Sequence, residues 1–156
     1  MKLLYVHHAD RDRSNKNVPR QEQDITKSGE IEAELLAEKL RQFNITAIYT
    51  SPYLRCKHTA EILNKYLNVP IYEEEKLNEM KNGETWKELQ ERNMKAIDEI
   101  VKKHNSDDDF VICVSSGVNL SSFIYYFTNQ KPSNDNPWIQ AVTCTPVLFS
   151  TNNQCL

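Results

Sequence analysis

Short apolar segments alternate along this chain with longer segments whose apolar residues recur at helical spacing. The clearest apolar segment is residues 110–114, Phe-Val-Ile-Cys-Val, which is uninterrupted by a charged or amide side chain. Such a run is typical of a strand at the centre of a parallel sheet. The other expected strands are residues 2–6, 45–50, 69–72 and 141–149. This alternation predicts a three-layer α/β/α sandwich around a mostly parallel sheet.

Helices are expected between these strands. The first begins near Ser28, with Thr26 as its N-cap, and carries an apolar face listed as Ile31, Leu35, Leu36, Leu40 and Phe43. Pro52 is expected to open the second helix, because proline is tolerated in a first turn. Residues 85–88, Thr-Trp-Lys-Glu, have the capping-box form, and Ser116-Gly117 precedes the last helix. Pro146 predicts that the final strand lies at a sheet edge, and residues 131–137 are expected to form a loop.

Length and charge narrow the class of protein. A chain of 156 residues suits a single domain, residues 1–156, with one core. The net charge of −3 argues against a polyanion or nucleic-acid binder, so any phosphate site must be local. The opening apolar segment is too short for a secretory signal, and no apolar run is long enough for a membrane span. The four cysteines form no CxxC pair, which indicates neither a zinc site nor a disulfide framework and favours a reducing cytoplasm.

Polar motifs follow the expected strands. The first strand is followed by His7-His8-Ala9, and the central strand by Ser115-Ser116-Gly117. The second strand is followed by residues 50–60, Thr-Ser-Pro-Tyr-Leu-Arg-Cys-Lys-His-Thr-Ala, and the third by residues 77–79, Leu-Asn-Glu. Ligands of open α/β sheets bind beyond the carboxyl ends of the strands. These four segments are therefore expected to form one cleft.

Taken in order, these motifs resemble those of the histidine phosphatase (phosphoglycerate mutase-like) superfamily. Residues 50–60 are similar to the family's SSPLxRAxQTA segment, residues 25–29 to its LTxxG segment, and residues 77–79 to its LxE segment. The resemblance spans residues 1 to about 125. It implies a phosphoglycerate mutase-like fold, a small phosphorylated molecule or inorganic phosphate as ligand, and neither metal nor cofactor.

The resemblance also implies roles for individual residues. His8 is expected to be the nucleophile that takes the phosphoryl group, and Arg55 to hold phosphate oxygens with its planar fork. Glu79 is expected to give a proton to the leaving group. His7, Ser116 and Ser14 occupy positions that contribute to phosphate binding in the family.

Two of these positions depart from the family pattern. The family's first arginine is His7 here, and its second histidine is Ser116; Ala9 also replaces a glycine. Loss of one preorganised donor commonly lowers a rate by about 10²–10³-fold. Very slow or undetectable hydrolysis is therefore expected. Arg11, Arg13 or Arg20, in the loop after the first strand, could supply the missing cation.

Three functions remain open on this sequence. The first is a weak or specialised phosphomonoester phosphatase that uses His8. The second is a catalytically inactive relative that binds a phosphorylated ligand or a protein partner, and the third is an interaction module with a vestigial pocket. Retention of His8, Arg55 and Glu79 favours the first two over the third, and the changes at His7 and Ser116 favour the second over the first. A mutase is less favoured, because that role requires the full pocket.

Overall fold

A computed structural model of the chain describes residues 1–130, 139 and 141–150. Its centre is a five-stranded sheet in the order β3-β2-β4-β1-β5. The strands are β1 (Lys2–His7), β2 (Ala47–Thr50), β3 (Ile71–Glu73), β4 (Phe110–Ser115) and β5 (Pro146–Ser150). The first four pair in parallel, while β5 runs antiparallel to β1. The apolar segment that begins at Phe110 is the central strand, as predicted.

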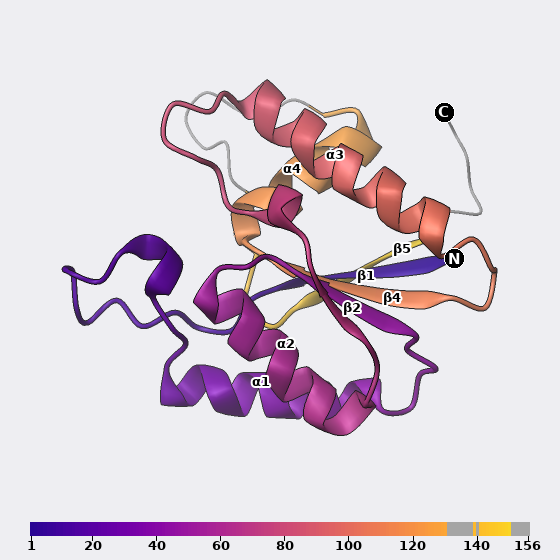
Figure 1. Cartoon of the computed structure of the whole chain (residues 1–156), viewed down its shortest axis with the longest axis horizontal. Coiled ribbons are helices and arrows are strands. Elements are labelled where there is room, and N and C mark those ends of the chain that lie inside the picture. The colour runs from indigo at the N-terminus through magenta and orange to yellow at the C-terminus, as the bar shows by residue number, and fades with distance from the viewer. Residues whose placement is uncertain (131–138, 140, 151–156) are drawn as a thin grey trace.

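Helices cover both faces of this sheet. They are α1 (Lys27–Leu40), α2 (Leu54–Leu67), α3 (Trp86–Lys103) and α4 (Gly117–Thr128). Short 3-10 turns, η1 (Arg20–Glu22) and η2 (Glu75–Leu77), lie in the connections. Figure 1 shows α1 and α2 on one side of the strands and α3 and α4 on the other. The predicted three-layer α/β/α sandwich with a mostly parallel sheet is therefore confirmed.

The alternation of side chains along β1 divides the core between the two faces. Leu3 and Tyr5 pack with residues of α3 and α4, including Ile97, Leu120 and Phe123. Their neighbours in sequence point to the other face, because successive side chains of a strand alternate in direction. There the core joins strand and helix residues of α1 and α2, namely Leu4, Val6, Leu36, Leu40 and Leu63.

The predicted apolar face of α1 is partly wrong. Leu36 and Leu40 are buried, but Ile31 is 58% exposed, Leu35 is 54% exposed and Phe43 also lies at the surface. The buried positions of α1 are instead Gly29, Ala33, Leu36, Ala37 and Leu40. Small residues dominate because this helix packs very closely: a Cβ atom on Gly29 would lie 2.7 Å from the Asp10 carbonyl oxygen.

Other boundaries differ by a few residues from those expected. Helix α2 begins at Leu54 rather than Pro52, and Tyr53 is its N-cap. The third strand starts two residues late, at Ile71, and the last starts at Pro146. Strand β5 is an edge strand of the described sheet, as Pro146 predicted. The capping box at Thr85 is present, and the loop expected at residues 131–137 lies outside the described residues.

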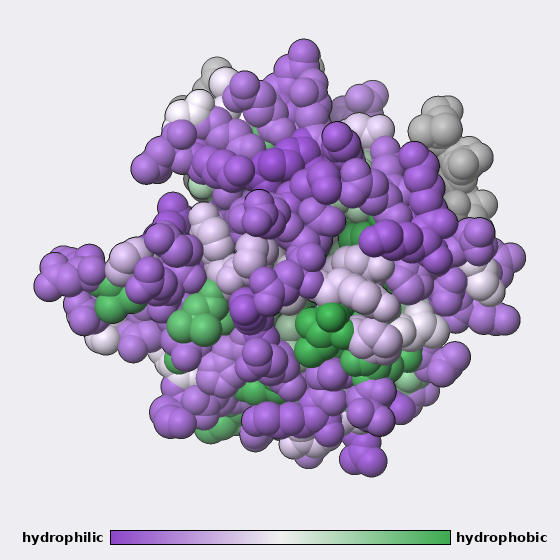
Figure 2. Space-filling model, viewed as in Figure 1, coloured by the Kyte–Doolittle hydropathy of each residue, from purple (hydrophilic) through white to green (hydrophobic). Residues whose placement is uncertain are grey.

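The face in Figure 2 is mainly hydrophilic, and its hydrophobic residues gather in small separate patches. Within the described ranges, none of the helices combines the length and the apolar character needed to cross a membrane.

Candidate active site

Three neighbouring parallel strands, β2, β4 and β1, end at the same edge of the sheet. Beyond their carboxyl ends lies a cavity of about 240 Å³. The structure brings the predicted residues together here, although they are far apart in sequence. The polar residues that line the cavity are His7, His8, Arg11, Arg13, Arg20, Glu79 and Ser116. Arg55 lies directly behind this surface with no solvent exposure.

The imidazole of His8 is buried and held in one tautomer by its two partners. Its Nδ1 lies 2.8 Å from the Ala9 carbonyl oxygen, which can only accept a hydrogen bond. Its Nε2 lies 3.0 Å from Arg55 Nε, which can only donate. Nδ1 therefore carries the proton and Nε2 presents its lone pair. Burial, with the neighbouring His7 as the next cause, holds the pKa of His8 well below its ordinary value, so the ring is neutral.

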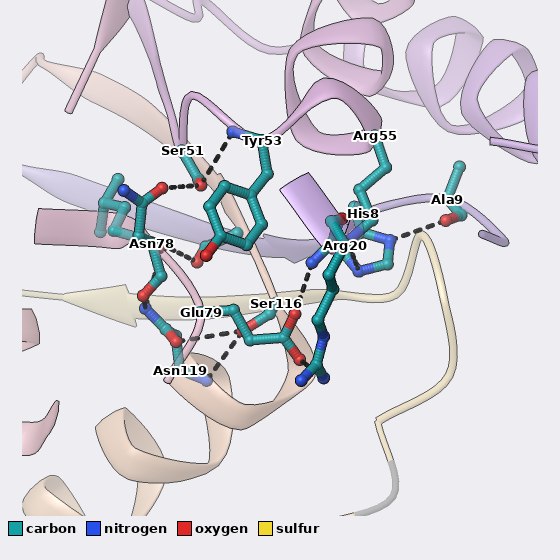
Figure 3. Close-up of polar contacts among 12 residues, drawn as sticks. His8, Ala9, Arg20, Ser51, Tyr53, Arg55, Asn78, Glu79, Ser116 and Asn119 are labelled. Atoms are coloured by element: carbon teal, nitrogen blue, oxygen red, sulfur yellow. Dashed lines mark hydrogen bonds and ion pairs between the residues drawn. The ribbon is translucent and has the colours of Figure 1, made fainter. Parts of the chain in front are cut away.

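Arg55 joins the nucleophile candidate to the acid candidate. Its Nε donates to His8, its Nη2 pairs with Glu79, and its Nη1 donates to the Arg20 carbonyl oxygen at 2.7 Å. Glu79 is 7% exposed and also accepts from Arg20 Nη2 at 2.5 Å. Figure 3 shows the Glu79 carboxylate between the two guanidinium groups. Each of the three nitrogens of this fully buried guanidinium thus has a protein partner.

The segment that carries Arg55 is tied to the end of β1 by Thr59. One turn after Arg55 in α2, Thr59 Oγ1 donates to the Arg55 carbonyl oxygen at 2.6 Å. The same hydroxyl accepts from the Ala9 backbone N–H at 3.1 Å. This bridge fixes His8 relative to α2. Sequence reasoning assigned Thr59 no role, although its place in the matched segment at residues 50–60 was a signal.

A second polar network positions Glu79. The carbonyl oxygen of Leu77 accepts from Ser115 Oγ at 2.5 Å and from Asn119 Nδ2 at 3.0 Å. Asn119 Nδ2 also lies 3.0 Å from the Asn78 carbonyl oxygen. Residues of β4 and α4 therefore hold the backbone just before Glu79. Asn119 was not predicted, and only its place three residues after the N-cap position hinted at a role.

Neither substituted position presents a free donor to the cavity. His7 Nδ1 lies 3.0 Å from the Ala141 carbonyl oxygen, so its proton is used there, and burial lowers the pKa of His7. The hydroxyl of Ser116 caps α4, accepting from the Asn119 N–H, and it donates to Asn119 Oδ1 at 3.0 Å. Ser14 lies in an exposed turn, where its N–H donates to Asp12, and the structure does not bring it to the cavity.

The loop after β1 contributes three arginines to the cavity wall. Arg13 is 66% exposed, with Nη1 3.7 Å from Asp10 Oδ1, and Arg20 is 56% exposed and paired with Glu79. Arg11 is more enclosed: its Nε is buried and has no hydrogen-bond partner among the described residues. The wall is therefore cationic although the whole chain carries a net charge of −3.

A three-layer α/β fold with a neutral buried imidazole beneath a cationic cleft defines a class of protein suited to phosphate-like anions. The chain belongs to the histidine phosphatase superfamily, branch 1, whose family profile matches residues 3–84 and 80–155. The family resemblance found in the sequence is thereby confirmed.

Individual relatives agree with this assignment. A Bacillus subtilis protein named "Uncharacterized phosphatase PhoE" is 38% identical over 60 residues, which are 38% of this chain and 31% of that protein. The chain spans only 26% to 43% of the length of the curated relatives it matches.

Solved structures show the same fold at lower sequence identity. YhfR of Bacillus stearothermophilus has a TM-score of 0.81 at 22% identity, covering 94% of this chain and 89% of that one. The phosphoserine phosphatase of Entamoeba histolytica, in complex with 3-phosphoglyceric acid, has a TM-score of 0.78 at 16% identity, covering 96% and 90%. The second of these structures holds a small phosphorylated ligand.

Proposed function

We propose that this protein hydrolyses phosphomonoesters of small molecules, slowly, through a phosphohistidine on Nε2 of His8. The observation that carries this proposal is the fixed tautomer of His8. A neutral imidazole with its proton on Nδ1 has its nucleophilic lone pair on Nε2, which faces the Arg55 guanidinium. Nucleophile and cation are thus adjacent, as phosphoryl transfer requires.

The proposed reaction has two steps. In the first, His8 Nε2 attacks phosphorus, the bond between phosphorus and the ester oxygen breaks, and Glu79 gives a proton to the departing oxygen. In the second, water attacks phosphorus, the bond between phosphorus and His8 Nε2 breaks, Glu79 takes a proton from that water, and inorganic phosphate leaves. The guanidinium groups stabilise the charge on the equatorial oxygens in both steps.

Binding of the substrate would have to rearrange the Arg55 contacts. Arg55 Nε occupies the lone pair of His8, and its Nη2 is paired with Glu79. A phosphoryl group that accepts from Arg55 would free the lone pair of His8 for attack and would leave Glu79, which must take up a proton before it acts as an acid, with Arg20 as its cationic partner. A second cavity of about 520 Å³ shares Arg20, Glu79 and Val118 with the first, and offers room for the leaving group.

The occupied lone pair is also the observation that favours a second function. If Arg55 stays on His8, the cleft binds a phosphorylated ligand without turnover. The changes at His7 and Ser116 point in the same direction, because neither side chain presents a donor to the cavity.

Turnover by the purified protein separates the two functions. We would assay an aryl phosphate and a panel of small phosphometabolites, and look for acid-labile phosphate on the protein after rapid quenching. His8→Ala should abolish both signals, while His104→Ala, at the far end of α3, should retain them. Phosphate binding without any His8-dependent turnover would establish the second function.

A further inference from the structure

Position 7 carries a histidine where the family has an arginine, so the proposed phosphate site lacks one cation. Three arginines in the loop after β1 are candidates to replace it. His7 is no substitute, because its Nδ1 proton is used by Ala141 and burial lowers its pKa. Of the loop arginines, Arg20 is already paired with Glu79, and Arg13 is largely solvated and lies near Asp10. Arg11 is therefore the remaining candidate for the missing cation.

The side chain of Arg11 is half-buried, and its buried part is unsatisfied within the described residues. It lines the cavity, and its buried Nε has no hydrogen-bond partner among the described residues. A buried polar group without a partner costs about 1–3 kcal/mol, and more when charged, so such groups are rare unless something binds them. Burial is the largest cause of a lowered pKa for Arg11, and repulsion from Arg55 is the next.

The backbone of Arg11 is held in place by contacts with the segment that begins at Ile25. Arg11 forms an isolated antiparallel bridge with Ile25. Beside it, Thr26 donates its N–H to the Asp10 carbonyl oxygen at 2.8 Å and its hydroxyl to the Asp10 carboxylate at 3.1 Å. Gly29 permits this close approach, because a Cβ there would collide with the Asp10 carbonyl. The segment at residues 25–29 therefore holds Arg11 over the cavity.

We infer that Arg11 binds the phosphoryl group and supplies the cation that position 7 lacks. Arg11 lines the cavity, whereas Arg55 lies directly behind its wall. If the phosphoryl group displaces the present contacts of Arg55, the two guanidinium groups would hold it from different elements. For its catalytic consequence this inference rests on the proposed function, but binding of a phosphate-like anion tests it without turnover.

The first test measures binding of inorganic phosphate and of orthovanadate by calorimetry. Arg11→Ala should weaken binding roughly 10- to 100-fold, because one charge-assisted hydrogen bond is lost. Arg11→Lys, which keeps the charge but loses the planar fork, should fall between wild type and Arg11→Ala. Arg41→Ala, at the C-terminal end of α1, removes an equal charge outside the cavity and serves as the control. Unchanged affinity in Arg11→Ala would overturn the inference.

The second test is rescue. His7→Arg should recover much of the affinity lost in Arg11→Ala, yet change the wild type by about threefold or less, since in the wild type the cation is already present. Circular dichroism would confirm that each variant is folded. A folded double variant that recovers none of the loss would show that Arg11 does not stand in for position 7.

The outcomes also separate this inference from the proposed function. If the wild type shows His8-dependent turnover that Arg11→Ala leaves intact, the phosphatase stands and the role of Arg11 falls. If the wild type binds phosphate through Arg11 but never forms a phosphohistidine, the role of Arg11 stands and the hydrolysis falls.

Discussion

The two walls of the cavity hold their charges in different ways. On the α2 side, Arg55 is fully buried and each of its three donor nitrogens has a protein partner. On the side of the loop after β1, Arg13 and Arg20 are more than half exposed, and Arg11 has a buried nitrogen with no partner in the part of the chain that the structure describes. Every nitrogen of the Arg55 guanidinium is therefore held by the protein, whereas the side of the loop after β1 has a buried donor, Arg11 Nε, that no described residue uses.

This difference indicates which positions should tolerate substitution. A nucleophile must be aimed, so His8 depends on Ala9, Arg55 and the Thr59 bridge together. A cation need only reach the phosphoryl oxygens, because Coulomb attraction has little directional demand. A guanidinium lost from one position can therefore be replaced from another that reaches the same space, as we propose for Arg11.

We call the α2 side of the cavity the buried wall and the side of the loop after β1 the exposed wall. The largest expected effect comes from removing Arg55, at the centre of the buried wall. Arg55→Met should lower the free energy of unfolding by about 3–5 kcal/mol, because Glu79 would keep its buried charge with one partner gone. Arg20→Ala also takes a partner from Glu79, but water can replace a guanidinium that is 56% exposed, so this change should cost only about 0–1 kcal/mol. Urea unfolding followed by circular dichroism would measure both.

A compensating variant checks the cause of that loss. Glu79→Gln in the Arg55→Met background removes the orphaned charge and should restore part of the stability. If Arg55→Met and Arg20→Ala cost the same, the two walls do not differ in the way described here.

The sequence predicted the buried wall better than the exposed one. His8, Arg55 and Glu79 each follow a strand or open a helix, and parallel strands bring such positions to one edge. The loop of residues 10–25 has no periodicity, so the sequence could name Arg11, Arg13 and Arg20 but not choose between them. Choosing required the pairing of Arg20 with Glu79 and the bridge between Arg11 and Ile25.

Helix α1 shows the same limit in the fold itself. Hydrophobicity alone placed Ile31 and Leu35 on its buried face, but both are exposed. The helix lies so close to Asp10 and α2 that Gly29, Ala33 and Ala37 fill the contact instead. Periodicity indicates that a helix is amphipathic, but the spacing between the packed elements decides how large its buried side chains can be.

A smaller effect is expected from restoring the family's residues at the two positions that differ from its pattern. His7→Arg combined with Ser116→His should raise kcat/KM on an aryl phosphate roughly 10- to 100-fold, because both side chains would stabilise charge on the same phosphoryl group. If Arg11 already supplies the cation, most of this gain should appear with Ser116→His alone. Comparison of the wild type, both single variants and the double variant in steady-state kinetics would show this.

Folding must be checked in these variants, since Ser116 caps α4 and loss of a cap costs about 1 kcal/mol. Ser116→Ala, which loses the cap without adding an imidazole, is the matched control. A folded double variant that is no faster than the wild type would mean that the pocket differs further, with Ala9 as the next position to restore.

The smallest expected effect is the dependence of folding stability on pH. Burial lowers the pKa of both His7 and His8 from the ordinary value of 6.5, so each stays neutral in the folded protein where the unfolded chain would begin to bind a proton. The unfolded state then binds more protons than the folded state below about pH 6.5, and stability must decrease as the pH falls through that value.

As the pH falls from 7 to 6, the unfolded chain takes up protons on its histidines. Each histidine that stays neutral in the folded protein should therefore reduce the free energy of unfolding by up to about 0.7 kcal/mol. His8, which is more deeply buried than His7, should contribute the larger part. Urea unfolding at several pH values would measure the slope, and His8→Asn should reduce it more than His7→Asn does. Arg13→Ala, on the exposed wall, should leave the slope as it is in the wild type. If His8→Asn does not change the slope, His8 accepts a proton as readily in the folded protein as in the unfolded chain. The buried wall would then be open to water, and the neutral nucleophile of the proposed mechanism would lose its physical basis.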